Sequence, residues 1–135
     1  MIILDTNIIS ELKKDKPDKH VFQWFDSLED SVVLTTITTG ELQRGVMFLP
    51  EGRWKARLTA VLETILSQYG DTILDYDNPP ALAYGSLCAD LRAKGIGISQ
   101  SDAMIAAITS VHGATLATRN DKDFLHCGIP VINPF

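Results

Sequence analysis

The chain has 135 residues, of which 45% are apolar and 21% are charged, and its formal net charge is −5. This length fits a single domain, residues 1–135, whose core needs no disulfide or metal for its stability. The apolar fraction excludes an intrinsically disordered chain. The presence of only two cysteines, Cys88 and Cys127, excludes a disulfide-rich secreted protein and predicts reduced thiols in the cytoplasm.

Neither export nor membrane insertion is indicated by any segment. The N-terminus lacks a basic region and carries Asp5, so we expect no signal peptide. The longest uncharged run, 103–118, contains Gly113 and is shorter than the roughly 20 apolar residues of a spanning helix. Twelve basic against 17 acidic residues argue against a protein that coats nucleic acid through positive charge. A nuclease remains possible, because a metal ion and a few local cations can hold one phosphate.

Short β-branched runs alternate with segments of helical periodicity along the chain. Strands are predicted at 2–4, 32–35, 72–74, 114–118 and 130–132. Helices are predicted at 6–14, 21–28, 39–48, 53–68, 79–94 and from 99 or 101 to 112. Strands joined by helices form parallel crossovers, so we predict an α/β fold with three layers, α/β/α. Ligands in such folds bind outside the carboxyl ends of the strands.

Acidic residues from four distant segments are predicted at this carboxyl edge. Asp5 follows the first strand, and Glu41 lies near the start of the helix after the second strand. Asp102 begins the helix that leads into the fourth strand, and Asp121 and Asp123 follow that strand. The convergence of these carboxylates on one edge is the main functional signal in the sequence.

Each acidic residue taken alone also has a structural interpretation. Asp5 is suited to cap the helix that follows it, and Asp121 is suited to a turn. The segments Thr38–Glu41 and Ser99–Asp102 both match a capping-box pattern. A non-catalytic binding domain that keeps these acids only as helix caps is therefore one alternative.

Electrostatics argues against that alternative for the group as a whole. Each pair of carboxylates about 5 Å apart costs roughly 3 kcal/mol at an effective dielectric near 20, so three pairs cost about 10 kcal/mol. This is comparable to the whole stability of a domain, about 5–15 kcal/mol. Such a cluster persists only if it is protonated or holds a cation, and an all-oxygen ligand set favours Mg²⁺ or Mn²⁺. A metal held this way suits the hydrolysis of phosphodiester bonds by an activated water.

Four sequence blocks resemble the motifs of PIN-domain ribonucleases. They are ILDTNIISE at 3–11, ITTGELQRG at 37–45, SDAMIAA at 101–107 and LATRNDKDF at 116–124, and the ending GIPVINPF at 128–135 also fits. The blocks occur in the family's order and span the chain. The sequence is most similar to the VapC toxin group, particularly its FitB-like branch.

The resemblance implies a PIN-like sandwich with a parallel five-stranded sheet in the order 3-2-1-4-5. It implies a metal-dependent endoribonuclease that acts as the toxin of a type II toxin–antitoxin pair and leaves 5′-phosphate and 3′-hydroxyl ends. It also implies a homodimer and a VapB- or FitA-like antitoxin whose basic tail occupies the acidic cleft, with DNA contacted only through that antitoxin. The RNA target, with transfer RNA as one candidate, and the number of ions stay open.

Carried over by position, the resemblance assigns the metal to Asp5, Glu41 and Asp102. Many relatives carry a fourth acid where Asn120 stands here, so Asn120 or the adjacent Asp121 is the candidate for a water-positioning or fourth catalytic residue. Asp123 is a weaker candidate. The supporting residues expected around the ligands are Thr6, Asn7 and Thr118, and Arg119 is expected to contact a substrate phosphate.

The basic residues, the aromatic residues and the overall function each allow two interpretations. The basic residues Lys13, Lys14, Lys16 and Lys19 either guide RNA or form a solvated loop, and we favour the loop. We expect Trp24 and Phe25 in the core and Trp54 partly exposed, where it would fit an antitoxin groove. A phosphatase or phosphotransfer domain with Asp5 as nucleophile is the alternative function, although Asn7 stands where a phosphatase of the haloacid-dehalogenase kind would carry a second acid.

Overall fold

A computed structural model of the chain describes residues 1–135 and has the predicted three-layer arrangement around a parallel sheet. The strands are β1 (Ile2–Leu4), β2 (Val32–Val33), β3 (Thr115–Ala117) and β4 (Val131–Ile132). The helices are α1 (Thr6–Leu12), α2 (Lys19–Asp26), α3 (Thr36–Met47), α4 (Arg53–Tyr69), α5 (Asn78–Ala93) and α6 (Gln100–Val111), with two short 3₁₀ helices, η1 (Gly70–Thr72) and η2 (Asp121–Phe124).

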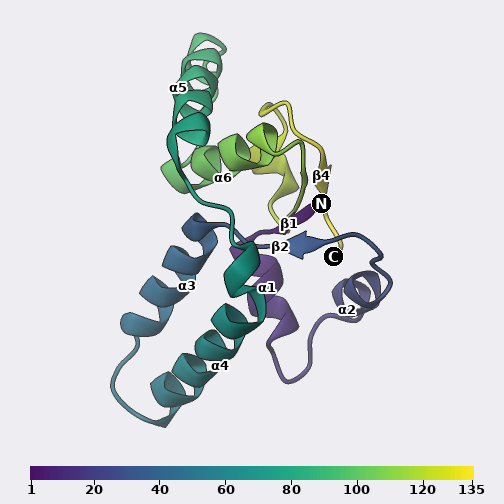
Figure 1. Ribbon diagram of the computed structural model, residues 1–135, viewed down its shortest axis with the longest axis vertical. Helices are drawn as coiled ribbons and strands as arrows, with labels where there is room; N and C mark the ends of the chain where they lie inside the picture. Colours follow the sequence, from purple (N-terminus) through teal and green to yellow (C-terminus); the bar gives the residue numbers. More distant parts are fainter.

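The alternation of side chains along β1 explains why helices cover both faces of the sheet. Ile2 and Leu4 belong to a buried cluster that includes residues of α1, α2 and α4. Ile3 belongs to a second cluster, formed with residues of α6 and β3. Because successive strand residues face opposite sides, an apolar strand of this kind needs a helical layer on each side. Figure 1 shows α1 and α4 on one side of the sheet and α6 on the other.

The spatial order of the strands is β2-β1-β3-β4, with every pair parallel. This confirms the predicted order, but the predicted strand at 72–74 is reduced to a single parallel bridge between Leu74 and Thr35. Thr72 instead ends η1, which begins with Gly70 and Asp71, residue types that favour a turn over a strand. The sheet therefore has four strands where five are predicted.

Helix α3 begins at Thr36 rather than at the predicted Thr39. Its N-cap is the buried Thr35, whose side-chain oxygen accepts a hydrogen bond from the backbone N–H of Thr38 at 3.2 Å. The capping box predicted at Thr38–Glu41 is therefore wrong. Glu41 lies in the second turn of α3, too far along the helix to cap it, so capping does not explain a carboxylate at this position.

Helix α6 begins after Ser99, whose hydroxyl oxygen accepts from the backbone N–H of Asp102 at 3.2 Å. This N-cap fixes the first turn of α6, which carries Asp102. Helix α5 packs on α6 and extends away from the sheet (Figure 1). The remaining boundaries differ from the predicted ones by two residues at most. None of the helices is long and apolar enough to cross a bilayer.

Candidate active site

A polar pocket of about 410 Å³ opens at the carboxyl edge of the sheet. Asp5 enters it from the end of β1, Glu41 from α3 and Asp102 from the first turn of α6. The three predicted acids therefore line one pocket and are not spread over separate surfaces. The other residues that line it are Thr6, Asn7, Ser10, Glu11, Lys14, Arg119, Asn120 and Phe135.

Asp5 is almost completely buried, with 5% of its surface exposed, and three donors hold its carboxylate. The backbone N–H of Thr6 donates to Oδ1 at 2.8 Å, while the Thr118 hydroxyl and the Asn7 amide donate to Oδ2 at 2.7 and 3.3 Å. The hydroxyl of Thr6 donates to Glu41 Oε1 at 2.8 Å, so one residue contacts both acids. A carboxylate has about four acceptor sites, and these contacts leave about one at Asp5 for an outside ligand.

The loop after β3 is fixed by the same network. Thr118 Oγ1 accepts from the backbone N–H of Asn120 at 3.1 Å, and Asn7 Oδ1 accepts from the backbone N–H of Arg119 at 3.0 Å. The guanidinium carbon of Arg119 lies 4.6 Å from the centre of the Phe135 ring. The backbone contacts hold Asn120 and Arg119 beside the acids, at the edge of the same pocket.

Burial is the main electrostatic feature of the pocket. It is the largest cause that raises the pKa of Asp5 above its ordinary value; hydrogen bonds from Thr118, Thr6 and Asn7 lower it, and the charge of Glu41 raises it further. Burial also raises the pKa of Asp102 most, with smaller contributions from Asp5 and Asp123. Loss of hydration is a larger effect here than the mutual repulsion of the carboxylates that the sequence predicts. Both effects favour a bound proton or cation over bare carboxylates.

The donor set fits a hard divalent cation in chemistry, although its members are not already gathered around one point. No three His, Cys, Asp or Glu side chains lie close enough together, as they are placed here, to hold one ion. The pocket nevertheless offers carboxylate oxygens from Asp5, Glu41 and Asp102 and no sulfur or imidazole. Oxygen ligands of this kind, completed by water, are what Mg²⁺ and Mn²⁺ prefer.

The structure separates the candidates for the fourth acidic position. Asn120 lines the pocket. Asp121 is exposed and does not line it; its Oδ1 accepts from the side-chain amide of Asn133 at 3.0 Å. Asp123 also lies outside the set of lining residues, but its charge contributes to the raised pKa of Asp102. Asn120 is thus the one residue of the three that meets the pocket directly.

Sequence reasoning missed one charged residue of the pocket, Glu11, and favoured a solvated loop for another, Lys14. Glu11 is buried, with 8% of its surface exposed, and the ammonium of Lys14 lies 2.6 Å from its Oε2. The signal was present in the spacing, since Glu11 lies one helical turn after Asn7 and therefore on the same face of α1. Lys14 belongs to the basic run for which the sequence leaves two interpretations, a guide for RNA and the favoured solvated loop.

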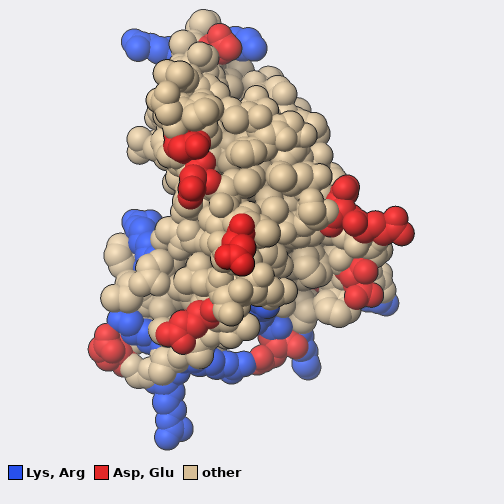
Figure 2. All heavy atoms as spheres, in the orientation of Figure 1, with Lys and Arg blue, Asp and Glu red and all other residues tan.

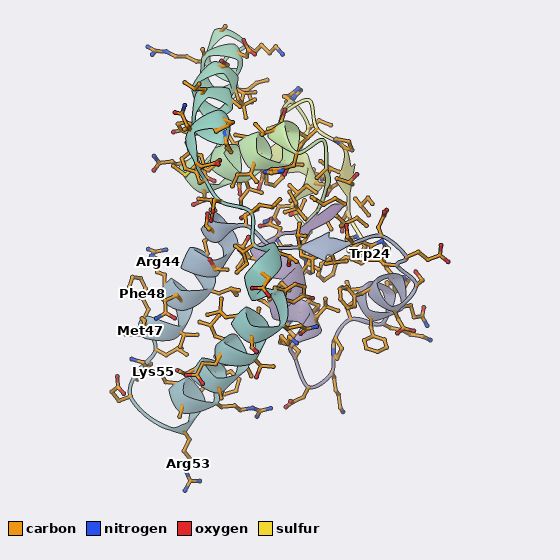
Figure 3. The ribbon with its side chains drawn as sticks, viewed as in Figure 1. Trp24, Arg44, Met47, Phe48, Arg53 and Lys55 are labelled. Carbon is orange, nitrogen blue, oxygen red and sulfur yellow. The ribbon has the colours of Figure 1, made fainter.

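A second, largely apolar groove of about 510 Å³ lies between α1, α3 and α4 and adjoins the acidic pocket. Trp54, half-exposed at 58%, lines it together with Leu58 and Val61. Four residues line both cavities, namely Thr6, Ser10, Lys14 and Glu41. Trp24 and Phe25 instead pack against the core cluster, as predicted, and Figure 3 shows Trp24 on α2, away from the labelled side chains of α3 and α4.

Comparison with known families identifies the fold and the placement of these motifs. Residues 2–129 match the family model for the PIN domain. The chain belongs to the PIN-domain family. The four sequence blocks that resemble PIN motifs all lie within the matched region, and so do Asp5, Glu41 and Asp102.

Three relatives of this PIN domain match over its whole length. It is 39% identical to the plasmid stability protein StbB of Pseudomonas syringae pv. tomato and covers 99% of that protein. It is 38% identical to the toxin FitB of Neisseria gonorrhoeae, again covering 99%, and 35% identical to a VapC ribonuclease of Sinorhizobium fredii, covering 98%.

Solved structures show the same relationship. The crystal structure of FitAcB from Neisseria gonorrhoeae matches with a TM-score of 0.92 and 38% identity, covering 99% of this PIN domain and 98% of that chain. A structure of FitAB bound to a DNA fragment matches with a TM-score of 0.92 and 37% identity, covering 99% of this chain and 95% of that one. The fold is therefore that of the toxin subunit class seen in these complexes.

Proposed function

We propose that this PIN domain is a metal-dependent endoribonuclease and the toxin of a type II toxin–antitoxin pair. The observation that carries the proposal is the single pocket lined by Asp5, Glu41 and Asp102, in a chain that matches a toxin and a ribonuclease over its whole length. The match runs from residue 2 to 129, and we take residues 1–135 as one PIN domain.

Asp5, Glu41 and Asp102 would hold Mg²⁺ or Mn²⁺ in this function. When bound, the cation supplies a water of lowered pKa and neutralises charge on the phosphoryl oxygens. The chain's own residues orient the ligands: Thr118 and Asn7 hold Oδ2 of Asp5, and Thr6 holds Glu41. Such outer contacts fix ligand orientation and raise affinity.

Two further residues complete the proposed site. We propose that Asn120, which lines the pocket and whose backbone is bonded to Thr118, orients the attacking water or the substrate. We propose that Arg119, which lines the pocket and stacks on Phe135, contacts a phosphate of the RNA. Asp121, which bonds with Asn133, contributes to the shape of this loop and not to a contact in the pocket.

The proposal is tested by incubating the purified chain with total cellular RNA and Mn²⁺, then mapping the ends of the products. We expect internal cuts with 5′-phosphate and 3′-hydroxyl ends, lost on addition of a chelator and lost in Asp5→Asn. Asp71→Asn, at an exposed acid outside the pocket, is the matched control and should cut normally. Equal cutting by Asp5→Asn and the wild type would exclude this site as the source of the activity.

The apolar groove fits the antitoxin partner. Its lining combines Leu58, Val61 and Ile65 of α4 with Ile9 of α1, and it adjoins the acidic pocket. An antitoxin segment with an apolar face and a basic tail would fill the groove and place its positive charges beside the carboxylates. Figure 3 shows Met47 and Phe48 on α3 at the same end of the molecule, and both are exposed. DNA would be contacted through the antitoxin alone.

Substitution in the groove tests that assignment. Trp54→Ala should weaken the complex with the cognate antitoxin, because a half-buried aromatic anchor is lost from the groove. Phe22→Ala, at an equally exposed aromatic of α2 outside the groove, is the control and should bind as the wild type does. If Trp54→Ala and Phe22→Ala bind the antitoxin with equal affinity, the antitoxin binds outside this groove.

The proposal extends to assembly and location. We propose a homodimer, in keeping with the toxin class to which the chain belongs. We also propose that the protein acts in the cytoplasm, where RNA is available and where the two cysteines, both free in the structure, stay reduced.

A further inference from the structure

The acidic pocket contains a buried ion pair that the proposed metal chemistry does not use. Glu11 has 8% of its surface exposed, and its side-chain oxygen Oε2 is buried without a hydrogen-bond partner. The ammonium of Lys14 lies 2.6 Å from this oxygen and forms an ion pair with it. The Lys14 side chain keeps 59% of its surface exposed.

The charged residues that line the pocket are mainly acidic, which gives Lys14 a role in admitting a phosphate. Asp5, Glu11, Glu41 and Asp102 are acidic and line the pocket, whereas Lys14 and Arg119 are its only basic lining residues. An RNA phosphate that approaches four carboxylates is repelled unless cations stand beside them. A divalent ion offsets two of the four charges, and the two basic side chains offset the others.

The two cations enter the pocket from different parts of the chain. Arg119 comes from the loop after β3 and stacks on Phe135. Lys14 follows α1, and its backbone N–H donates to the carbonyl of Glu11 at 3.2 Å. Lys14 lines both the acidic pocket and the adjoining groove, whereas Arg119 lines only the pocket. Lys14 therefore lies at the boundary between the acidic pocket and the groove.

We propose that Lys14 binds a backbone phosphate of the RNA substrate next to the one that is cut, and that Glu11 positions it there. The inference rests on the proposed ribonuclease function and deepens it. The buried Glu11 carboxylate holds the exposed ammonium at the boundary of the two cavities, so less side-chain freedom is lost when the phosphate arrives. The ammonium keeps donors free for that phosphate, since it carries three.

The neighbouring lysines provide matched controls. Lys16 is exposed and lines neither cavity, while Lys13 lines only the groove. Figure 2 shows Lys and Arg over the lower part of the molecule, with acidic side chains among them, and further basic side chains at the upper tip. A general electrostatic effect would make the loss of Lys14 and the loss of Lys16 similar, whereas a specific phosphate contact at Lys14 would not.

The experiment measures steady-state cleavage of a transcript that carries a cut site mapped for the wild type. We expect Lys14→Met to raise KM about tenfold with little change in kcat, as for the loss of one charged phosphate contact. Lys16→Met should leave both constants unchanged, and Lys14→Arg should restore KM because it keeps the charge. The slope of log affinity against log salt should fall by about 0.7 in Lys14→Met, the value for one phosphate of a single strand.

A second variant separates binding from folding, because Lys14→Met leaves the buried Glu11 without its cation. In the double variant Glu11→Gln with Lys14→Met the buried charge is gone, so we expect near-normal thermal stability with KM still raised about tenfold. Equal KM for Lys14→Met and Lys16→Met, a drop in kcat alone, or a normal KM in the double variant would each overturn the inference. If the wild type cuts no RNA, the proposed function itself is wrong and the inference falls with it.

Discussion

Asp5 carries a structural and a chemical role in one side chain. It precedes α1 as its N-cap and accepts from Thr6, as the structural interpretation of the sequence requires. It is also buried in the pocket and bonded to Thr118 across the sheet, which a simple cap does not require. Capping alone therefore does not explain the burial and the contacts of the Asp5 side chain. The contact with Thr118 gives a way to separate the structural role from the chemical one.

Replacing Thr118 by valine should impair cleavage more than folding. The change keeps the side-chain shape but removes the donor to Asp5 Oδ2, at a cost of about 1–3 kcal/mol in the free energy of unfolding. Loss of a group that orients a metal ligand typically lowers affinity or activity about 10- to 100-fold. Cleavage rates and urea unfolding of the variant measure the two effects.

Thr109→Val is the matched control for this change. Thr109 is as deeply buried as Thr118, but its hydroxyl donates to the carbonyl of Ile105 within α6, outside the pocket. We expect a comparable loss of stability with no loss of cleavage. If both variants cut RNA at the same reduced rate, Thr118 has no particular role at Asp5.

The raised pKa of Asp5 predicts how stability depends on pH. Its folded form holds a proton more tightly than the unfolded chain, so without metal the stability decreases as pH rises from the ordinary pKa of 3.8 through the raised folded value. Asp5→Asn removes this contribution, and its free energy of unfolding should fall less over the same range. Urea unfolding at a series of pH values with a chelator present measures the difference. Parallel curves for the two proteins would contradict a raised pKa at Asp5.

At the scale of elements, the sequence predicts the helices well because their periodic pattern extends over many residues. It predicts caps and short strands poorly, because only a few residues indicate each. The segment from Thr35 to Thr39 offers several equivalent cap residues, and local rules alone do not choose among them. Thr35 becomes the cap because it is buried beside Leu74 at the end of β2, which is a tertiary contact. The same contact is all that remains of the predicted third strand. Both differences come from packing between distant segments.

The N-cap of α6 gives a prediction at this scale. Ser99→Ala removes the acceptor for the backbone N–H of Asp102, which should lower the free energy of unfolding by about 1 kcal/mol. Cleavage should decrease as well, because the first turn of α6 carries Asp102. Ser101→Ala, at the other predicted cap, should change stability by less than about 0.5 kcal/mol. A larger effect at Ser101 than at Ser99, measured by urea unfolding, would show that the cap is misassigned.

For the whole molecule, the topology determines more of the site than local patterns do. The order β2-β1-β3-β4 places the ends of β1 and β3 side by side, so Asp5 and Thr118 meet although 113 residues separate them. Alternating strands and helices predict this convergence, and the pocket has it. The distances among the acids depend on side-chain packing, which the sequence pattern does not contain.

The same argument predicts that divalent metal stabilises the whole fold. Because burial and like charge both disfavour bare carboxylates in the pocket, a cation that binds only the folded chain shifts the folding equilibrium. At about 100 times its dissociation constant it adds about 2.7 kcal/mol, which corresponds to a rise in Tm of about 8 °C for a domain of this size. Thermal unfolding with Mn²⁺ and then with excess chelator should show the rise and its reversal. Asp5→Asn should show almost no rise, while Asp71→Asn should keep the full one. An equal rise in Asp5→Asn would mean that the ion binds outside the pocket, and the carboxylates would then need protons, not metal, to coexist.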